Sequence, residues 1–110
     1  MLLVEDEDEV RTPTTRLLAL CGYEVTAVKG PREAMAMLEE RAFDLVLSDF
    51  DLGADLDGGD VLRRARELYP AAHRVCITGN EVRVPESEGD YLILRKPFDL
   101  DALLAAIAPR

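Results

Sequence analysis

The stretch LVLSDFDLGADLDGGD, residues 45–60, joins a short apolar run to a series of acidic residues. Residues 45–47 are apolar with polar residues on either side, a pattern that suits a strand buried on both faces of a parallel sheet. Five aspartates follow, namely Asp49, Asp51, Asp55, Asp57 and Asp60. An uncompensated carboxylate at the end of a buried strand is costly, so Asp49 is the aspartate for which we first expect a functional role.

The size and charge of the chain limit the classes of function it can have. With 110 residues, of which 48% are hydrophobic, it is predicted to form one globular domain around one core. A net charge of −9 argues against nucleic acid as a partner, because no basic patch is available to displace counterions from phosphates. No apolar run approaches the roughly twenty residues that span a bilayer, and no signal segment opens the chain. We therefore expect a cytoplasmic protein that does not contact membranes.

Short apolar runs alternate with segments of helical spacing. The other runs are residues 1–4, 75–77 and 91–94, and residues 24–28 half alternate as an edge strand does. Helical spacing relates Val10, Leu17, Leu18 and Cys21; Ala34, Met35 and Leu38; Val61, Leu62, Ala65, Leu68 and Tyr69; and Leu100, Leu103, Leu104 and Ile107. This succession predicts an α/β fold with a mostly parallel sheet and helices on both faces. Residues 80–90 leave room for one short helix at most.

Several residues predict where the helices begin and end. These are Gly22 after the first helix, Gly30 and Pro31 at the start of the second, Pro70 after the third and Asp99 as cap of the last. Pro13 leaves two alternatives for the first helix, which either kinks or begins at Thr12 as its N-cap. Cys21 and Cys76 are expected to be small buried residues, and His73 to lie in a surface loop.

Polar residues that follow the predicted strands are expected to meet. In open parallel sheets, ligand sites form beyond the carboxyl ends of the strands, where the strand order reverses. The residues at these ends are Glu5, Asp6, Asp49, Thr78 and Lys96. Carboxylates about 4 Å apart repel by roughly 4 kcal/mol at an effective dielectric constant near 20, and a divalent cation relieves that repulsion. A site with so few protein oxygen ligands favours Mg²⁺ over Ca²⁺. The hydroxyl of Thr78 and the ammonium group of Lys96 are suited to bind the oxygens of a phosphoryl group.

Other acidic residues have simpler interpretations. Glu7, Asp8 and Glu9 are typical of the solvated first turn of a helix, where the helix dipole favours negative charge. Asp55, Asp57 and Asp60 are expected to shape the loop and cap the helix that follows it, since AspGlyGlyAsp is typical of a loop that enters a helix.

Four motifs together resemble those of response-regulator receiver domains of two-component signalling. They are LLVEDE at residues 2–7, DLVLSD at 44–49, ITG at 77–79 and KPFDLDALL at 96–104. The resemblance covers nearly the whole chain, in the order and near the spacing of the family. It implies a flavodoxin-like, doubly wound sheet of five parallel strands in the order 2-1-3-4-5, with a fourth helix that is short or irregular here. It also implies a single receiver domain over residues 1–110, with no output domain.

The resemblance further implies a phosphorylation-dependent switch. Asp49 would accept a phosphoryl group from a sensor histidine kinase or a histidine phosphotransfer protein and hydrolyse it slowly, without turning over an external substrate. Mg²⁺ would be bound by Asp6, Asp49 and the main-chain carbonyl of Asp51, with Glu5 acting through water. Thr78 and Lys96 would contact the phosphoryl oxygens. An unknown downstream protein and a weak homodimer complete the implied partners.

The sequence departs from the family pattern in several places, one of which is the loop after Asp49, where Gly53 replaces a frequent proline and about one extra residue precedes AspGly. The position that is often aromatic in the family holds Ile93, with Tyr91 two residues earlier and expected on the same face of the strand. The span from Thr78 to Lys96 is a few residues short, at the expense of the fourth helix. Asp51 and Asn80 occupy the positions that tune dephosphorylation in the family, so the lifetime of the phosphorylated state is not fixed by the motifs.

Three other readings of the acidic stretch are weaker. A haloacid-dehalogenase-like phosphatase uses a motif such as AspPheAsp on its first strand, whereas here two strand-helix units precede it. A calcium-binding EF-hand loop needs Gly at its sixth position and Glu at its twelfth, and counting from Asp49 these positions hold Ala54 and Asp60. A receiver-like module that works by protein contact alone, without phosphorylation, remains the main alternative. The presence of all four phosphorylation-site residues, Asp6, Asp49, Thr78 and Lys96, argues against it.

Overall fold

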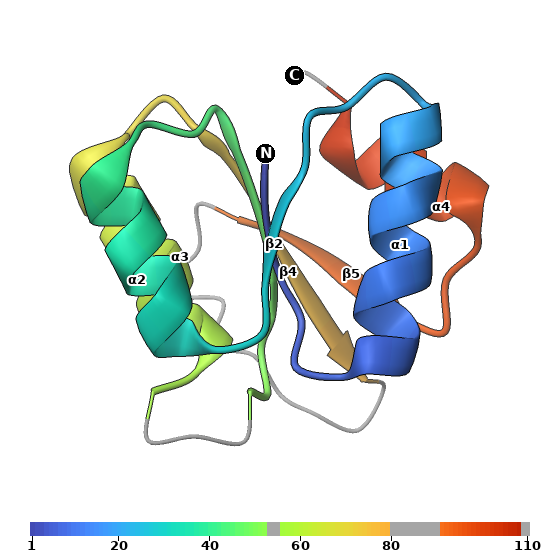
Figure 1. Ribbon diagram of the computed structural model, residues 1–110, viewed down its shortest axis with the longest axis horizontal. Coiled ribbons are helices and arrows are strands. Elements are labelled where there is room, and N and C mark those ends of the chain that lie inside the picture. The colour runs from blue at the N-terminus through green and yellow to red at the C-terminus, as the bar shows by residue number, and fades with distance from the viewer. Residues whose placement is uncertain (53–55, 80–90, 109–110) are drawn as a thin grey trace.

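A computed structural model of the chain describes residues 1–52, 56–79 and 91–108. Its elements, in chain order, are β1 (Leu2–Val4), α1 (Asp8–Leu20), β2 (Thr26–Val28), α2 (Pro31–Glu40), β3 (Leu45–Asp49), α3 (Gly58–Leu68), β4 (His73–Gly79), β5 (Leu92–Lys96) and α4 (Leu100–Ile107). The sheet lies between two layers of helices, with α2 and α3 on one side and α1 and α4 on the other (Figure 1). Within the described residues, no helix is long and apolar enough to cross a membrane.

The five strands are parallel and follow the order β2-β1-β3-β4-β5, as predicted. The chain leaves β1 toward one edge to form β2 and then returns to the other side of β1 to form β3. The strand order therefore reverses between β1 and β3, which is where such sheets bind their ligands. Val4 of β1 pairs with Ser48 of β3, so the next residues, Glu5 just after β1 and Asp49 at the end of β3, lie side by side.

Each face of the sheet has its own hydrophobic core. Strand residues point alternately to opposite faces. In β3, Val46 joins the core under α2 and α3, whereas Leu45 and Leu47 join the core under α1 and α4. The helices contribute residues such as Leu38 and Leu18, which are completely buried. This double coverage explains why the strands are apolar runs rather than alternating ones.

Side chains cap two of the helices as predicted. Asp57 precedes α3 and accepts a hydrogen bond from the backbone N–H of Asp60 at 3.0 Å, while the carboxylate of Asp60 accepts one from the N–H of Asp57 at 2.9 Å. Asp99 caps α4 by accepting from the N–H of Ala102 at 2.8 Å. Gly22 follows α1 with a φ of +95°, a conformation that glycine adopts without strain. Asp55 lies outside the described residues, so its predicted role in the loop is untested.

Three sequence-based predictions about the periphery are wrong or incomplete. Helix α1 begins at Asp8 and contains Pro13, so the alternative in which it begins at Thr12 is wrong. Cys21 is exposed rather than buried, because it follows the last residue of α1, whereas Cys76 is buried as predicted. His73 is not in a loop but is the first residue of β4, and its Nε2 lies 2.7 Å from the carbonyl oxygen of Ala106. The prediction that residues 80–90 hold one short helix at most falls outside the described residues.

Candidate functional site

Three carboxylates converge at the carboxyl end of the sheet. One oxygen each of Glu5, Asp6 and Asp49 lies within 4.8 Å of the other two. Glu5 is only 1% exposed and Asp49 5%, while Asp6 is exposed. Buried carboxylates are rare unless they are paired or bound to a cation. The cluster predicted from the ends of the strands is therefore present in the structure.

Lys96 supplies the positive charge at this cluster. Its Nζ donates to Asp49 Oδ2 at 2.9 Å and to Glu5 Oε2 at 3.4 Å. It ends β5, which is separated from β3 by β4, so its side chain reaches across one strand to the acidic residues. One ammonium group faces three carboxylates, and the cluster keeps an excess of negative charge.

This excess charge alters the protonation of Glu5 and Lys96. Burial, together with the negative charge of Asp49, raises the pKa of Glu5 to about 7, although Lys96 and the N–H of Glu7 act in the opposite direction. For Lys96, burial favours a lower pKa, but the hydrogen bonds and charges of Asp49 and Glu5 outweigh it and raise the pKa. A proton on Glu5 and a bound cation are therefore alternative ways to relieve the same repulsion.

The donor atoms fit a hard divalent cation. All three side chains offer carboxylate oxygens, the ligands that Mg²⁺ prefers, and their net negative charge is incompletely neutralised by Lys96. Asp51 lies two residues beyond Asp49 on the exposed surface, near the point where β3 ends. The acidic residues Glu5, Asp6 and Asp49 are thus the candidate ligands, in agreement with the charge argument made from the sequence.

Hydrogen bonds to Glu5 hold the loop between β1 and α1 in place. The backbone N–H of Glu5 donates to Val28 of β2 at 3.1 Å, and Glu5 Oε1 accepts from the N–H of Glu7 at 3.3 Å. Arg11, one turn into α1, donates to the main-chain carbonyl of Glu5 at 2.9 Å and also pairs with Asp8. Sequence reasoning missed Arg11, although a cation six residues after Glu5 was a signal that the loop needs a donor.

The end of β3 is held by hydrogen bonds to its backbone groups, which the sequence did not reveal. Ser48 Oγ donates to the carbonyl of Asp49 at 3.0 Å, and the N–H of Phe50 donates to Ile77 of β4 at 2.8 Å. The N–H of Gly58, the first residue of α3, donates to the carbonyl of Phe50 at 2.7 Å. The start of α3 is therefore hydrogen-bonded to the residue that directly follows β3.

Thr78 lies on the neighbouring strand and is 1% exposed. Ile77 pairs with Asp49 across β3 and β4, so Thr78 is one residue further along, next to the point where the chain leaves the sheet. Its hydroxyl donates to the carbonyl of Gly79 at 3.4 Å. Strand pairing therefore places Thr78 near Asp49, while this hydrogen bond joins it to the next residue of its own strand. Asn80 lies outside the described residues.

Tyr91 and Ile93 lie on one side of the sheet, as predicted. Both pack, partly buried, against the core under α2 and α3. The intervening Leu92 packs against the opposite core. The usual aromatic position of the family thus holds an aliphatic side chain, with the tyrosine one pleat away.

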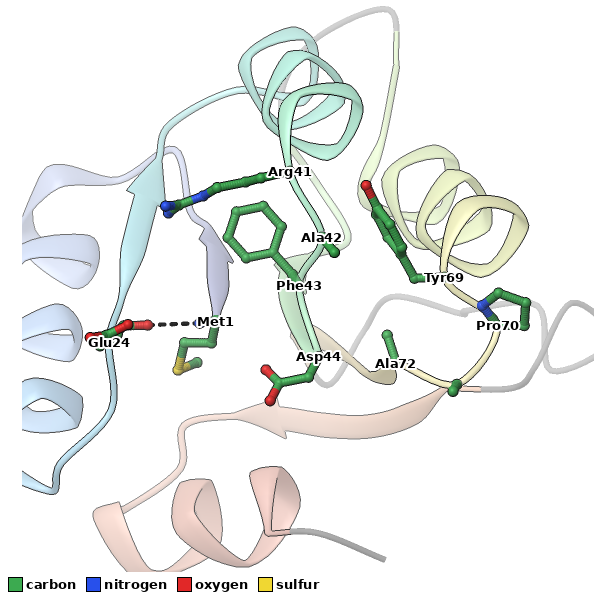
Figure 2. A pocket seen from close by; sticks show the side chains of 10 residues that line it. Met1, Glu24, Arg41, Ala42, Phe43, Asp44, Tyr69, Pro70 and Ala72 are labelled. Carbon is green, nitrogen blue, oxygen red and sulfur yellow. Dashed lines mark hydrogen bonds between the residues drawn. The ribbon is translucent and has the colours of Figure 1, made fainter.

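The opposite end of the sheet holds a hollow of a different kind. A cavity of about 640 Å³ is lined by Met1, Glu24, Arg41, Ala42, Phe43, Asp44, Tyr69, Pro70, Ala71 and Ala72, which precede the strands (Figure 2). Arg41 lies over the ring of Phe43, 5.0 Å from its centre, and also contacts Thr26. Glu24 and Asp44 are exposed there. This hollow is therefore mostly apolar, and its charges are solvated.

The order of the strands, the buried acidic cluster and the lysine together define a receiver domain of two-component systems. A model of the response regulator receiver domain family matches residues 1–108. The chain therefore belongs to the response regulator receiver domain family.

Similar proteins include short regulators and longer proteins. The response regulator receiver protein CpdR of Brucella abortus is 33% identical over 97% of this chain and 92% of its own length. The response regulator protein FleR of Pseudomonas aeruginosa is 35% identical, and the sensor kinase CckA of Brucella abortus is 32% identical; this chain spans 24% and 12% of their lengths.

Solved structures agree with this assignment. The crystal structure of a response regulator receiver protein from Sinorhizobium medicae has a TM-score of 0.90 and 35% identity, and the match covers 96% of this chain and 88% of that one. The receiver domain of the hybrid histidine kinase CckA has a TM-score of 0.79 and 35% identity, with 94% and 91% covered.

Proposed function

We propose that this receiver domain is a phosphorylation-dependent switch in which Asp49 accepts a phosphoryl group from a phosphohistidine. The donor would be a sensor histidine kinase or a histidine phosphotransfer protein, a class to which the similarity with the kinase CckA points. The observation that carries the proposal is the environment of Asp49, a buried carboxylate 2.9 Å from Lys96 and beside Glu5 and Asp6. Such a carboxylate is a fixed nucleophile with charged groups already arranged around it.

The chemistry asks for little beyond position and charge compensation. A carboxylate oxygen of Asp49 attacks the phosphorus in line, the P–N bond to the histidine breaks, and its electron pair stays on the imidazole, which takes up a proton from water. Lys96, already at Asp49, neutralises charge on the phosphoryl oxygens, and the Thr78 hydroxyl donates to another of them.

The acidic residues have a separate role. Asp6, Asp49 and the main-chain carbonyl of Asp51 would bind Mg²⁺ directly, with Glu5 acting through water; the ion adds positive charge beside the phosphoryl oxygens. Attack of water on the acyl phosphate later restores the free carboxylate of Asp49. Asp51 and Asn80, the residues two beyond Asp49 and Thr78, would set the rate of that hydrolysis.

The domain would thus transfer and hydrolyse its own phosphate rather than turn over an external substrate. We propose that it acts in the cytoplasm as a single receiver domain over residues 1–110 and passes its state to a downstream protein. Nucleic acid and membrane are not among its proposed partners. A weak homodimer is the proposed oligomer.

Labelling by a small phosphodonor tests this function. Incubation with acetyl phosphate and Mg²⁺ is expected to give one acid-stable, base-labile phosphate per chain in the wild type. Asp49→Asn should give none, because the amide is not a nucleophile toward phosphorus, and a chelator should suppress the label. Asp57→Asn is the matched control, since Asp57 caps α3 and its substitution keeps a capping oxygen. Equal labelling of Asp49→Asn, or no label in the wild type, would contradict the proposal and favour a module that works by contact alone.

A further inference from the structure

The first residue of α3 packs directly against the backbone of Asp49. A Cβ atom on Gly58 would lie 2.0 Å from the carbonyl oxygen of Asp49 and 2.8 Å from the Cα of Phe50. Real Cβ atoms essentially never come within 3.0 Å of such neighbours. Because the contacted atoms belong to the backbone, they cannot rotate away, and any side chain at position 58 must displace either the end of β3 or the start of α3.

Backbone conformation does not explain why a glycine stands here. Among the described glycines only Gly22 has a positive φ, so the backbone of Gly58 is one that any residue adopts. Alanine also favours a helix over glycine by about 1 kcal/mol. The capping box of Asp57 and Asp60 already starts α3. The requirement for glycine at position 58 is therefore one of space.

The space is occupied by a peptide group that is held from several sides. The carbonyl of Asp49 accepts from Ser48 Oγ at 3.0 Å, and Ser48 is completely buried. The N–H of the same peptide group, that of Phe50, donates to the carbonyl of Ile77 at 2.8 Å, and in the next peptide group the carbonyl of Phe50 accepts from the N–H of Gly58 at 2.7 Å. These contacts fix the direction in which Cα of Asp49 carries its side chain toward Lys96.

We propose that Gly58 is a positioning residue for the phosphorylation of Asp49, with Ser48 as its partner in holding the Asp49 carbonyl. This inference rests on the proposed function. Gly58 touches neither substrate nor metal and acts through the backbone of Asp49, keeping the carboxylate within hydrogen-bonding distance of Lys96 and within 4.8 Å of oxygens of Glu5 and Asp6. A shift of the reacting atom by about 1 Å costs on the order of 100-fold in rate.

Two adjacent glycines provide the test. Gly58→Ala is expected to lower the maximal labelling rate, at saturating acetyl phosphate and Mg²⁺, on the order of 100-fold, with the half-saturating donor concentration unchanged. A Cβ on Gly59 would instead meet side-chain atoms, Asp57 Oδ1 at 3.0 Å and Phe50 Cε1 at 3.3 Å. These can rotate, so Gly59→Ala should change the rate by less than about threefold. Equal rates for the two variants would overturn the proposal.

A stability control separates positioning from loss of folding. Val61 is completely buried in the same helix, and its side chain belongs to the hydrophobic core under α2 and α3, so Val61→Ala should lower the thermal midpoint without changing the labelling rate of the folded protein by more than about twofold. If Val61→Ala slows labelling as much as Gly58→Ala at temperatures where both are folded, the effect is one of stability and the proposal is wrong.

Two further measurements cover the remaining outcomes. If Gly58→Ala does not fold by circular dichroism, Ser48→Ala decides, because it removes one hydrogen bond to the Asp49 carbonyl and adds no atom; about tenfold slower labelling is expected, and a wild-type rate would overturn the proposal. If the wild type itself is not labelled, the proposed function has failed, and positioning is measured by calorimetry with Mg²⁺ alone. The variant that folds, Gly58→Ala or Ser48→Ala, is compared with Gly59→Ala. Weaker Mg²⁺ binding than by Gly59→Ala supports the proposal that Gly58 and Ser48 position Asp49, whereas equal affinities overturn that proposal.

Discussion

The two ends of the sheet place their charged residues in opposite environments. At the carboxyl end, Glu5 and Asp49 are buried and share the ammonium group of Lys96. At the amino end, Glu24, Arg41 and Asp44 are exposed around an apolar hollow (Figure 2). Charges that are withdrawn from water interact strongly with one another and with any ion that arrives, whereas solvated charges interact weakly. We therefore expect function and pH dependence to be concentrated at the carboxyl end.

Removal of the lysine should produce the largest contrast between the two ends. Lys96→Met is expected to slow labelling by acetyl phosphate at least about 100-fold, because a preorganised positive charge at the reacting group is lost. The initial rate at saturating Mg²⁺ measures this effect. Arg95→Met is the control, since Arg95 is the preceding residue of β5 and is exposed. If both variants label at the wild-type rate, the charge of Lys96 has no role in the transfer.

Neutralisation of Glu5 should have an intermediate effect that depends on pH. The pKa of Glu5 is raised to about 7 by burial and by Asp49, so the fold favours its protonated form. Its contribution to stability is therefore full below the ordinary carboxyl pKa and is lost as the pH rises toward 7. In the absence of metal, Glu5→Gln should raise the free energy of unfolding by about 2 kcal/mol at pH 8 and change it little at pH 4.

Urea unfolding of both proteins at the two pH values measures this difference. Glu9→Gln is the control, because Glu9 is exposed in the first turn of α1. Addition of Mg²⁺ at pH 8 should stabilise the wild type more than Glu5→Gln. If the free energies of unfolding of variant and wild type differ by the same amount at pH 4 and pH 8, the surroundings do not raise the pKa of Glu5.

At the amino end, the same kind of change should have the smallest effect. Arg41→Ala removes an exposed guanidinium that lies over Phe43 and contacts Thr26, and such contacts contribute about 1 kcal/mol or less. Labelling should stay at the wild-type rate. A loss of labelling would mean that the two ends of the sheet are coupled, and the simple contrast between them would be wrong.

Much of the fold was predictable because it depends on residue type and spacing. The apolar runs gave the strands, the resemblance gave their order, and Asp57, Asp60 and Asp99 cap helices as their positions predicted. The convergence of acidic residues with Lys96 also followed from the rule that parallel strands end at one edge.

The remainder depends on distances that spacing does not contain. Pro13 lies inside α1 although a proline removes one helical hydrogen bond, and His73 begins β4 and contacts Ala106 of α4, a residue far from it in the sequence. The degree of burial of Glu5, and hence its raised pKa, required the surrounding residues. Gly58 looked like an ordinary loop residue, because the carbonyl that fills its missing side-chain space comes from the end of another element.

The most direct test of the central claim is the position of the phosphate itself. Reduction of the acetyl phosphate-labelled protein with tritiated borohydride converts an aspartyl phosphate to homoserine and leaves free carboxylates unchanged. Peptide sequencing is expected to find the tritium at position 49. Tritium at position 6, 51 or 57 instead, or a labelled protein that incorporates none, would contradict the assignment of Asp49 as the residue that accepts the phosphoryl group.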